Sequence, residues 1–128
     1  MTFADGYDGD QVWSPDGRWV AFASDREGAV KIFRKRADGS GNVELVSECK
    51  DAQQQCFPNA WSPDGRLIAV GTGESDIWMV PVDGEGEPEP YLASPALEDG
   101  PAFSPDGRWV AYQSTESGSP AIYVQSYP

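Results

Sequence analysis

The chain has 128 residues, of which 39% are hydrophobic, and its 21 acidic and 9 basic residues give a net charge of −12. This length suits one domain with a real core, and the charge speaks against nucleic-acid binding, which depends on Lys and Arg neutralising phosphates. No apolar run approaches the roughly 20 residues of a membrane-spanning helix, so no membrane insertion is expected.

A short string occurs three times and is expected to form the same tight hairpin in each copy. It reads W-S-P-D-G-R from Trp13 and from Trp61, and F-S-P-D-G-R from Phe103. Proline suits the second position of a type I turn, Ser and Asp suit the first and third, and glycine takes the left-handed conformation that closes the loop. The turn residues are therefore expected to be structural. They are Ser14, Pro15, Asp16, Gly17, Ser62, Pro63, Asp64, Gly65, Ser104, Pro105, Asp106 and Gly107.

The predicted elements follow one order in each of three units. Residues 1–10 hold Asp-Gly pairs and are expected to form a loop, and residues 24–28 are expected to turn between the second and third strands. Short apolar runs bounded by such turns indicate strands, and no helical periodicity is present. The predicted strands are residues 11–13, 19–23, 30–36 and 43–46, then 59–61, 67–70, 77–82 and 91–93, then 102–103, 110–113 and 122–127.

The second strand of each unit is apolar on both faces, as in Trp19-Val20-Ala21-Phe22. A strand buried on both faces belongs to a sheet that lies between other sheets. Stacked four-stranded antiparallel units of about 40–50 residues are the blades of a β-propeller. The predicted fold is all-β, with blades at residues 1–47, 48–94 and 95–128, the last lacking its outer strand.

The repeat, with an Ile-aromatic strand and an Asp-Gly turn after the hairpin, resembles that of TolB-type β-propellers. The end of the chain, Ile122-Tyr123-Val124-Gln125-Ser126-Tyr127-Pro128, looks like propeller repeats appended to bacterial serine/threonine kinases. Similar repeats occur in the propellers of prolyl-oligopeptidase-type peptidases. The resemblance implies a non-catalytic scaffold that presents a surface to a protein or peptide. It also implies a ring of six or more blades, of which this chain holds three.

No catalytic, cofactor or metal site is predicted. The chain has no histidine, which removes the Ser-His-Asp triad and histidine-containing zinc sites, and no phosphate-binding glycine loop is present. Two alternatives to the scaffold stay open. One is the gating propeller of a peptidase or other hydrolase whose catalytic domain lies elsewhere, and the other is a carbohydrate-binding or glycoside-active propeller that uses acidic loops.

The loops expected at one end of the blades are rich in carboxylates. They could form an acidic face for a basic peptide, a protein partner or a cation, or they could be ordinary solvated loops. The residues chosen as candidates for partner binding are Asp5, Asp8, Asp10, Glu98 and Asp99. By contrast Trp13, Trp61 and Phe103, which share one repeat position, are expected to be packing residues.

Cys49 and Cys56 lie close together in one predicted loop between the first two units. We expect them to form a disulfide, which would place the domain in an oxidising compartment, periplasmic or extracellular. The alternative is two free thiols in a cytoplasmic protein.

Three blades cannot close a ring, so the first and the third are each expected to leave an apolar face exposed. Large apolar patches are rarely left bare on soluble proteins. We therefore expect either further blades or a homodimer in which two copies complete a six-bladed ring, with the third blade of one chain meeting the first blade of the other.

Overall fold

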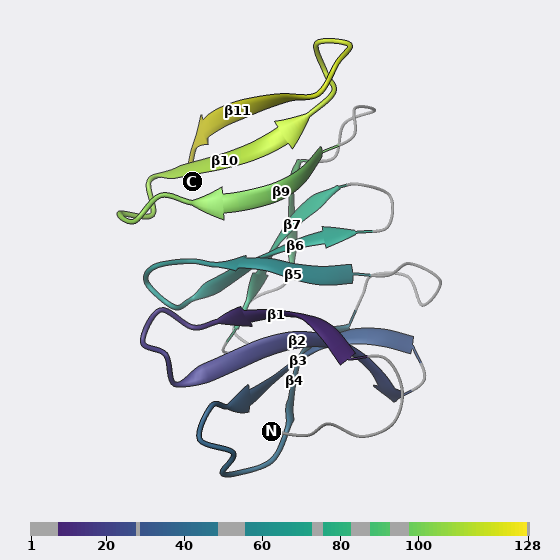
Figure 1. Cartoon of the computed structure of the whole chain (residues 1–128), viewed down its shortest axis with the longest axis vertical. Coiled ribbons are helices and arrows are strands. Elements are labelled where there is room, and N and C mark those ends of the chain that lie inside the picture. The colour runs from purple at the N-terminus through teal and green to yellow at the C-terminus, as the bar shows by residue number, and fades with distance from the viewer. Residues whose placement is uncertain are drawn as a thin grey trace.

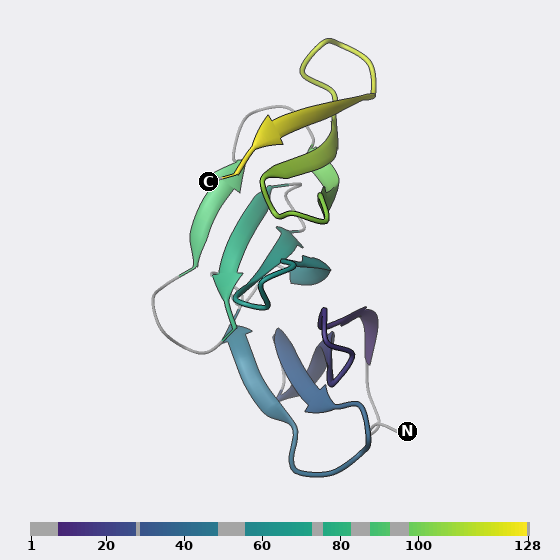
Figure 2. The same cartoon turned by 90° about the vertical axis from the view of Figure 1, so that its left-hand side faces the viewer.

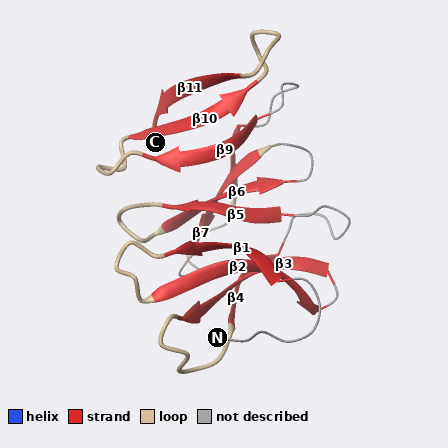
Figure 3. Ribbon diagram, viewed as in Figure 1, coloured by secondary structure: helices blue, strands red, loops and turns tan. Residues whose placement is uncertain are grey.

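A computed structural model describes residues 8–27, 29–48, 56–72, 76–82, 88–92 and 98–127, and shows three antiparallel sheets stacked along the long axis of the molecule (Figure 1). These residues form strands and loops without a helix (Figure 3). None of them therefore provides a helix that is long and apolar enough to cross a membrane. The strands are β1 Asp8–Trp13, β2 Trp19–Glu27, β3 Ala29–Arg36, β4 Glu44–Glu48, β5 Cys56–Trp61, β6 Leu67–Thr72, β7 Ile77–Pro81, β8 Glu89–Leu92, β9 Glu98–Phe103, β10 Trp109–Ser114 and β11 Ala121–Ser126.

Each sheet is a blade whose strands lie in sequence order. Blade 1 is β1-β2-β3-β4, blade 2 is β5-β6-β7-β8, and blade 3 is β9-β10-β11. The first strands β1, β5 and β9 contact one another in turn, and a view from the hairpin end shows them along one side of the stack, with β4 on the other (Figure 2). The predicted all-β propeller blades are confirmed.

The first strands are longer than predicted. β1 and β9 begin at Asp8 and Glu98, in segments expected to be loops. Antiparallel pairing with β2 and β10 continues through them, with a register shift between Gly9 and Val12. Likewise β2 runs to Glu27, so residues 24–27 of the predicted turn belong to the strand. The hydrogen bonds to a buried partner strand outweigh the weak β-propensity of Asp and Gly.

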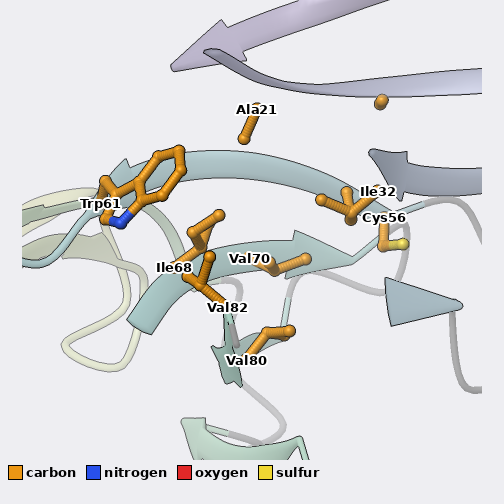
Figure 4. Close-up of a cluster of buried hydrophobic side chains, with 9 residues drawn as sticks. Ala21, Ile32, Cys56, Trp61, Ile68, Val70, Val80 and Val82 are labelled. Atoms are coloured by element: carbon orange, nitrogen blue, oxygen red, sulfur yellow. The ribbon is translucent and has the colours of Figure 1, made fainter. Parts of the chain in front are cut away.

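The core lies between the blades. Ala21, Ile32 and their neighbours in blade 1 pack against Trp61, Ile68 and Val70 of blade 2 (Figure 4). A second cluster joins Ile77 and Met79 of blade 2 to Val110 and Tyr112 of blade 3. Both faces of the second strand are buried in blades 1 and 2, as the sequence predicted, whereas β10 of blade 3 is buried only on the face toward blade 2.

The two outer faces of the stack differ. On blade 3, Trp109, Ile122 and Val124 are exposed, as expected for a face without a neighbouring blade. On blade 1, Phe22 and Phe33 on the central strands are buried and stack with ring centroids 6.1 Å apart. Among the described residues of this blade, the exposed large hydrophobic side chains are Trp13 on β1 and Leu45 on β4, near the edges of the sheet. The predicted exposed apolar face of blade 1 is therefore found at Trp13 and Leu45 and not at Phe22 and Phe33.

Candidate functional site

Each Ser-Pro-Asp-Gly hairpin is closed by its own side chains. In the second copy, the carboxylate Oδ1 of Asp64 accepts hydrogen bonds from Ser62 Oγ at 2.6 Å and from the backbone N–H of Arg66 at 3.0 Å. Ser62 Oγ accepts in turn from the backbone N–H of Leu67 at 3.0 Å. The backbone N–H of Gly65 donates to Ser62 O at 2.9 Å, and Gly65 has a φ of 79°. The aspartate thus holds the turn together.

The other two hairpins repeat these bonds. The serine hydroxyl lies 2.6 Å from the carboxylate of Asp16 in the first copy and of Asp106 in the third. The hydrogen bonds from this serine and from the arginine backbone two residues on lower the pKa of each aspartate below its usual value of 3.8. These carboxylates are ionised near neutral pH, and each is used by its own turn.

A hollow of about 400 Å³ lies beside the first strands near these hairpins. All three repeats contribute to it, because the shared aromatic position and the turn prolines recur in each blade. The walls are therefore mostly aromatic and proline side chains, with few polar groups. The lining residues are Trp13, Pro15, Asn59, Ala60, Trp61, Pro63, Pro101, Ala102, Phe103, Ser104 and Pro105.

The aromatic residue at the repeat position differs between blades. Trp61 is 8% exposed, packs in the core between blades 1 and 2, and donates from Nε1 to Gly65 O at 3.0 Å. Phe103 packs edge-on against Tyr127. Trp13 is 59% exposed. Trp61 and Phe103 are therefore packing residues as expected, whereas Trp13, on the outer face of the first described blade, is exposed.

A second, polar groove of about 670 Å³ separates the hairpins of blades 2 and 3. Asp64, Arg66 and Asp106 line it together with Phe103 and Tyr127. Burial raises the pKa of the Tyr127 hydroxyl, so this side chain is neutral near pH 7. The groove combines charged groups with aromatic rings. The carboxylates of Asp64 and Asp106, however, already accept hydrogen bonds within their own turns.

Four of the five predicted partner-binding residues lie at the opposite end of the first strands from the hairpins. Asp8 and Asp10 are in β1, and Glu98 and Asp99 begin β9, so these four are strand residues and not the loop residues expected. They come from blades 1 and 3, with blade 2 between them (Figure 1). Asp5 lies outside the described residues.

Cys56 is the first residue of β5 and is buried in the core between blades 1 and 2, so it does not lie in the predicted loop. Cys49 lies outside the described residues, and the bridge between the two stays a prediction. Among the described residues, no group of three or more histidine, cysteine, aspartate or glutamate side chains is placed to hold a metal ion.

Two guanidinium groups of blade 1 lie over one aromatic ring, a contact that was not predicted from the sequence. Arg34 and Arg36 lie 4.3 and 5.0 Å from the ring centroid of Trp19, and Arg34 pairs with Glu44 at 3.0 Å. The alternating register of β2 and β3 places these three residues on one face, and that spacing was the available signal. Cation–π contact with a tryptophan and an ion pair stabilise this face of the blade.

Known proteins similar to this chain include TolB proteins and an uncharacterised peptidase. The TolB protein of the Tol-Pal system from Bordetella pertussis is 32% identical over 111 residues, which is 87% of this chain and 25% of that protein. The uncharacterised peptidase YuxL from Bacillus subtilis is 30% identical over 82% of this chain and 21% of its own length. A solved structure described as a TolB from Agrobacterium tumefaciens superposes with a TM-score of 0.81 at 25% identity. It matches 98% of this chain and 46% of that one.

The chain therefore spans a quarter or less of the length of these curated relatives and about half of the solved structure. No family model matches it.

Proposed function

Because this chain belongs to the TolB-type family of β-propellers, we propose that it is a non-catalytic scaffold that binds a protein or peptide partner. The observation that carries the proposal is the apolar hollow beside the first strands, where aromatic and proline side chains of all three repeats meet. Peptide-binding grooves are lined predominantly by such side chains, which bury apolar residues of a partner. Similarity to a component of the Tol-Pal system supports a protein partner.

We propose that the partner presents an extended segment along the first strands. A strand of six residues such as β5 is about 20 Å long, so a segment of similar length would reach from the hollow to the strand starts. Apolar residues of the segment would occupy the hollow. Basic residues would lie toward Asp8, Asp10, Glu98 and Asp99, and the net charge of −12 would attract them.

Fluorescence anisotropy with a labelled peptide tests this proposal. The probe is an extended peptide of about ten residues with leucine and proline in one half and lysine in the other, and the control peptide carries glutamate in place of lysine. We expect the basic peptide to bind at least about tenfold more tightly, with an affinity that falls as salt is added. Equal binding of the two peptides, or none by either, would refute the proposal.

A matched pair of variants locates the binding. Pro105 lines the hollow, whereas Pro120 is an exposed proline in the connection before β11. Replacing either with asparagine removes a proline and leaves the charge unchanged. We expect Pro105→Asn to weaken binding of the basic peptide several-fold and Pro120→Asn to leave it unchanged. Equal effects of the two substitutions on the affinity would show that the peptide does not bind in the hollow.

The similarity to a peptidase supports one alternative, in which this chain is the accessory propeller of a peptidase whose catalytic domain lies elsewhere. Co-purification followed by a peptide-cleavage assay distinguishes the two functions. An accessory propeller is expected to co-purify with a protein that cleaves a peptide substrate, and a scaffold is expected to bind its peptide without any cleavage.

Two further parts of the proposal concern location and assembly. The predicted Cys49–Cys56 bridge supports a periplasmic or extracellular location over a cytoplasmic one. We also propose that two copies build one ring, because one copy matches 46% of the solved TolB structure and a second copy would supply a similar length.

A further inference from the structure

The outer face of blade 3 is an open apolar surface. Trp109 is 49% exposed, Val124 62% and Ile122 70%. A hollow of about 530 Å³ lies in this surface, and its walls are almost entirely apolar. Its lining residues are Ala102, Phe103, Ser104, Trp109, Ala111 and Val124. Exposed apolar surface of this kind is typical of a protein interface.

The chain itself shows twice how such a face is covered. The first strand of the next blade lies across it, since β5 contacts β1, β2 and β3, and β9 contacts β5, β6 and β7. At the first of these seams, the aromatic side chain that ends the covering strand, Trp61, packs in one cluster with Ala21 and the partly buried Trp19. In blade 3, Ala111 and Trp109 hold the positions of Ala21 and Trp19. The open face of blade 3 therefore repeats the surface on which Trp61 packs.

The matching aromatic residue is present and uncovered in this same sequence. Trp13 ends β1 as Trp61 ends β5, and 59% of it is exposed. We propose that β1 of a second copy lies across β9, β10 and β11, with its Trp13 in the hollow formed by Ala102, Trp109, Ala111 and Val124. This inference rests on the two-copy ring of the proposed function and assigns the residues of its seam.

The same contact made in both directions gives a closed assembly. The seam is heterologous, because the third blade of one copy meets the first blade of the other. A two-fold axis relates the two copies and produces two identical seams. No copy of this surface is then left uncovered. The buried Val20, Phe22 and Phe33 show that the central part of the far face of blade 1 is already covered. Blade 1 therefore contributes Trp13 and β1 to the seam.

Light scattering after size exclusion, on the whole chain at micromolar concentration, measures the assembly. We expect a mass of twice 13.9 kDa. Val124→Arg places a charge in the hollow and should raise the dimer dissociation constant at least about tenfold, as Trp13→Ala should by emptying it. Gln125→Arg is the matched control, because Gln125 is the exposed next residue on β11 and pairs with Val110, on the opposite face of the sheet. It should leave the dimer intact.

Mixing the two weakened variants tests the direction of the contact. A Trp13→Ala chain keeps an unchanged hollow on blade 3, and a Val124→Arg chain keeps Trp13. Their heterodimer therefore contains one intact seam. We expect the mixture to form more dimer than either variant alone. Circular dichroism spectra equal to that of the unmodified chain will show that the variants, all at exposed positions, remain folded.

A monomer near 13.9 kDa at about 100 μM, an open series of larger oligomers, or equal effects of Val124→Arg and Gln125→Arg would each overturn the seam. Anisotropy with the basic peptide separates this failure from that of the proposed function. A monomeric chain that still binds the peptide would retain the binding scaffold and lose only the two-copy ring, whereas a dimer that binds no peptide would retain the ring alone.

Discussion

Replacing Gly65 tests whether the repeated hairpin depends on a left-handed backbone. Gly65 has a φ of 79°, and a Cβ added there would meet no atom within 4 Å. The cost of a side chain is therefore conformational and not steric. An alanine in this conformation costs about 1–2 kcal/mol. Valine should cost more, because its branched Cβ resists positive φ, and asparagine should cost less, because Asn tolerates this conformation.

Urea unfolding of the three variants measures these differences. We expect the free energy of unfolding to fall in the order Asn, Ala, Val, with the alanine variant about 1 kcal/mol or more below the original chain. Gly17 and Gly107, with φ of 73° and 74°, serve as internal repeats of the experiment.

Gly71 provides a contrast within the same blade. Its φ is outside the left-handed region, but a Cβ there would lie 2.8 Å from Asn59 Oδ1, which accepts a hydrogen bond from the backbone N–H of Gly71. Asparagine should therefore bring no advantage over alanine at this position. If Gly65→Asn destabilises the chain as much as Gly65→Val, or if Gly65→Ala costs nothing, the conformational reasoning is refuted.

Further predictions concern stability, redox state and binding. The three turn aspartates have a pKa below 3.8 in the folded chain, so the stability they contribute is present above the unfolded value and is lost as the pH falls through the lower folded values. Acid titration of the unfolding free energy should show this loss below about pH 4, and a triple Asp→Asn variant should show less of it. Asp64→Asn should leave peptide binding unchanged, and lost binding at an unchanged melting temperature would contradict its turn role. If Cys49 and Cys56 are bridged, alkylation without reductant should add no mass, and closing this short loop should contribute at most about 2–3 kcal/mol. Ile68→Ala, in the core between blades 1 and 2, should cost about 2–5 kcal/mol in urea unfolding, and a smaller loss would argue against the tight blade packing.

The parts of the fold that depend on local chemistry could be predicted from the sequence. The Ser-Pro-Asp-Gly turns specify their own geometry, and the apolar runs after them specify buried strands. The starts of β1 and β9 could not be predicted in this way, because Asp8-Gly9-Asp10 and Glu98-Asp99-Gly100 have the composition of loops. They are strands because a longer neighbour offers them hydrogen bonds, which is a property of the sheet and not of the segment.

The candidate site was predicted less well for the same reason. Trp13 and Trp61 occupy the same repeat position and follow the same rules of local structure, yet one is exposed and the other is buried. The difference arises from whether a blade precedes each strand. Likewise the hollow beside the hairpins forms because three segments distant in the sequence stack together, so it could not be predicted from any single motif.

The hairpins are closed by local hydrogen bonds, and this affects how such a chain folds and evolves. Every bond that fixes the turn joins residues no more than five positions apart, and contacts of this kind form within microseconds, long before distant segments meet. Each repeat thus carries its own starting point for folding. A gene segment that encodes one blade can then be duplicated as a unit, and the copy will form its own turn before it packs against its neighbours.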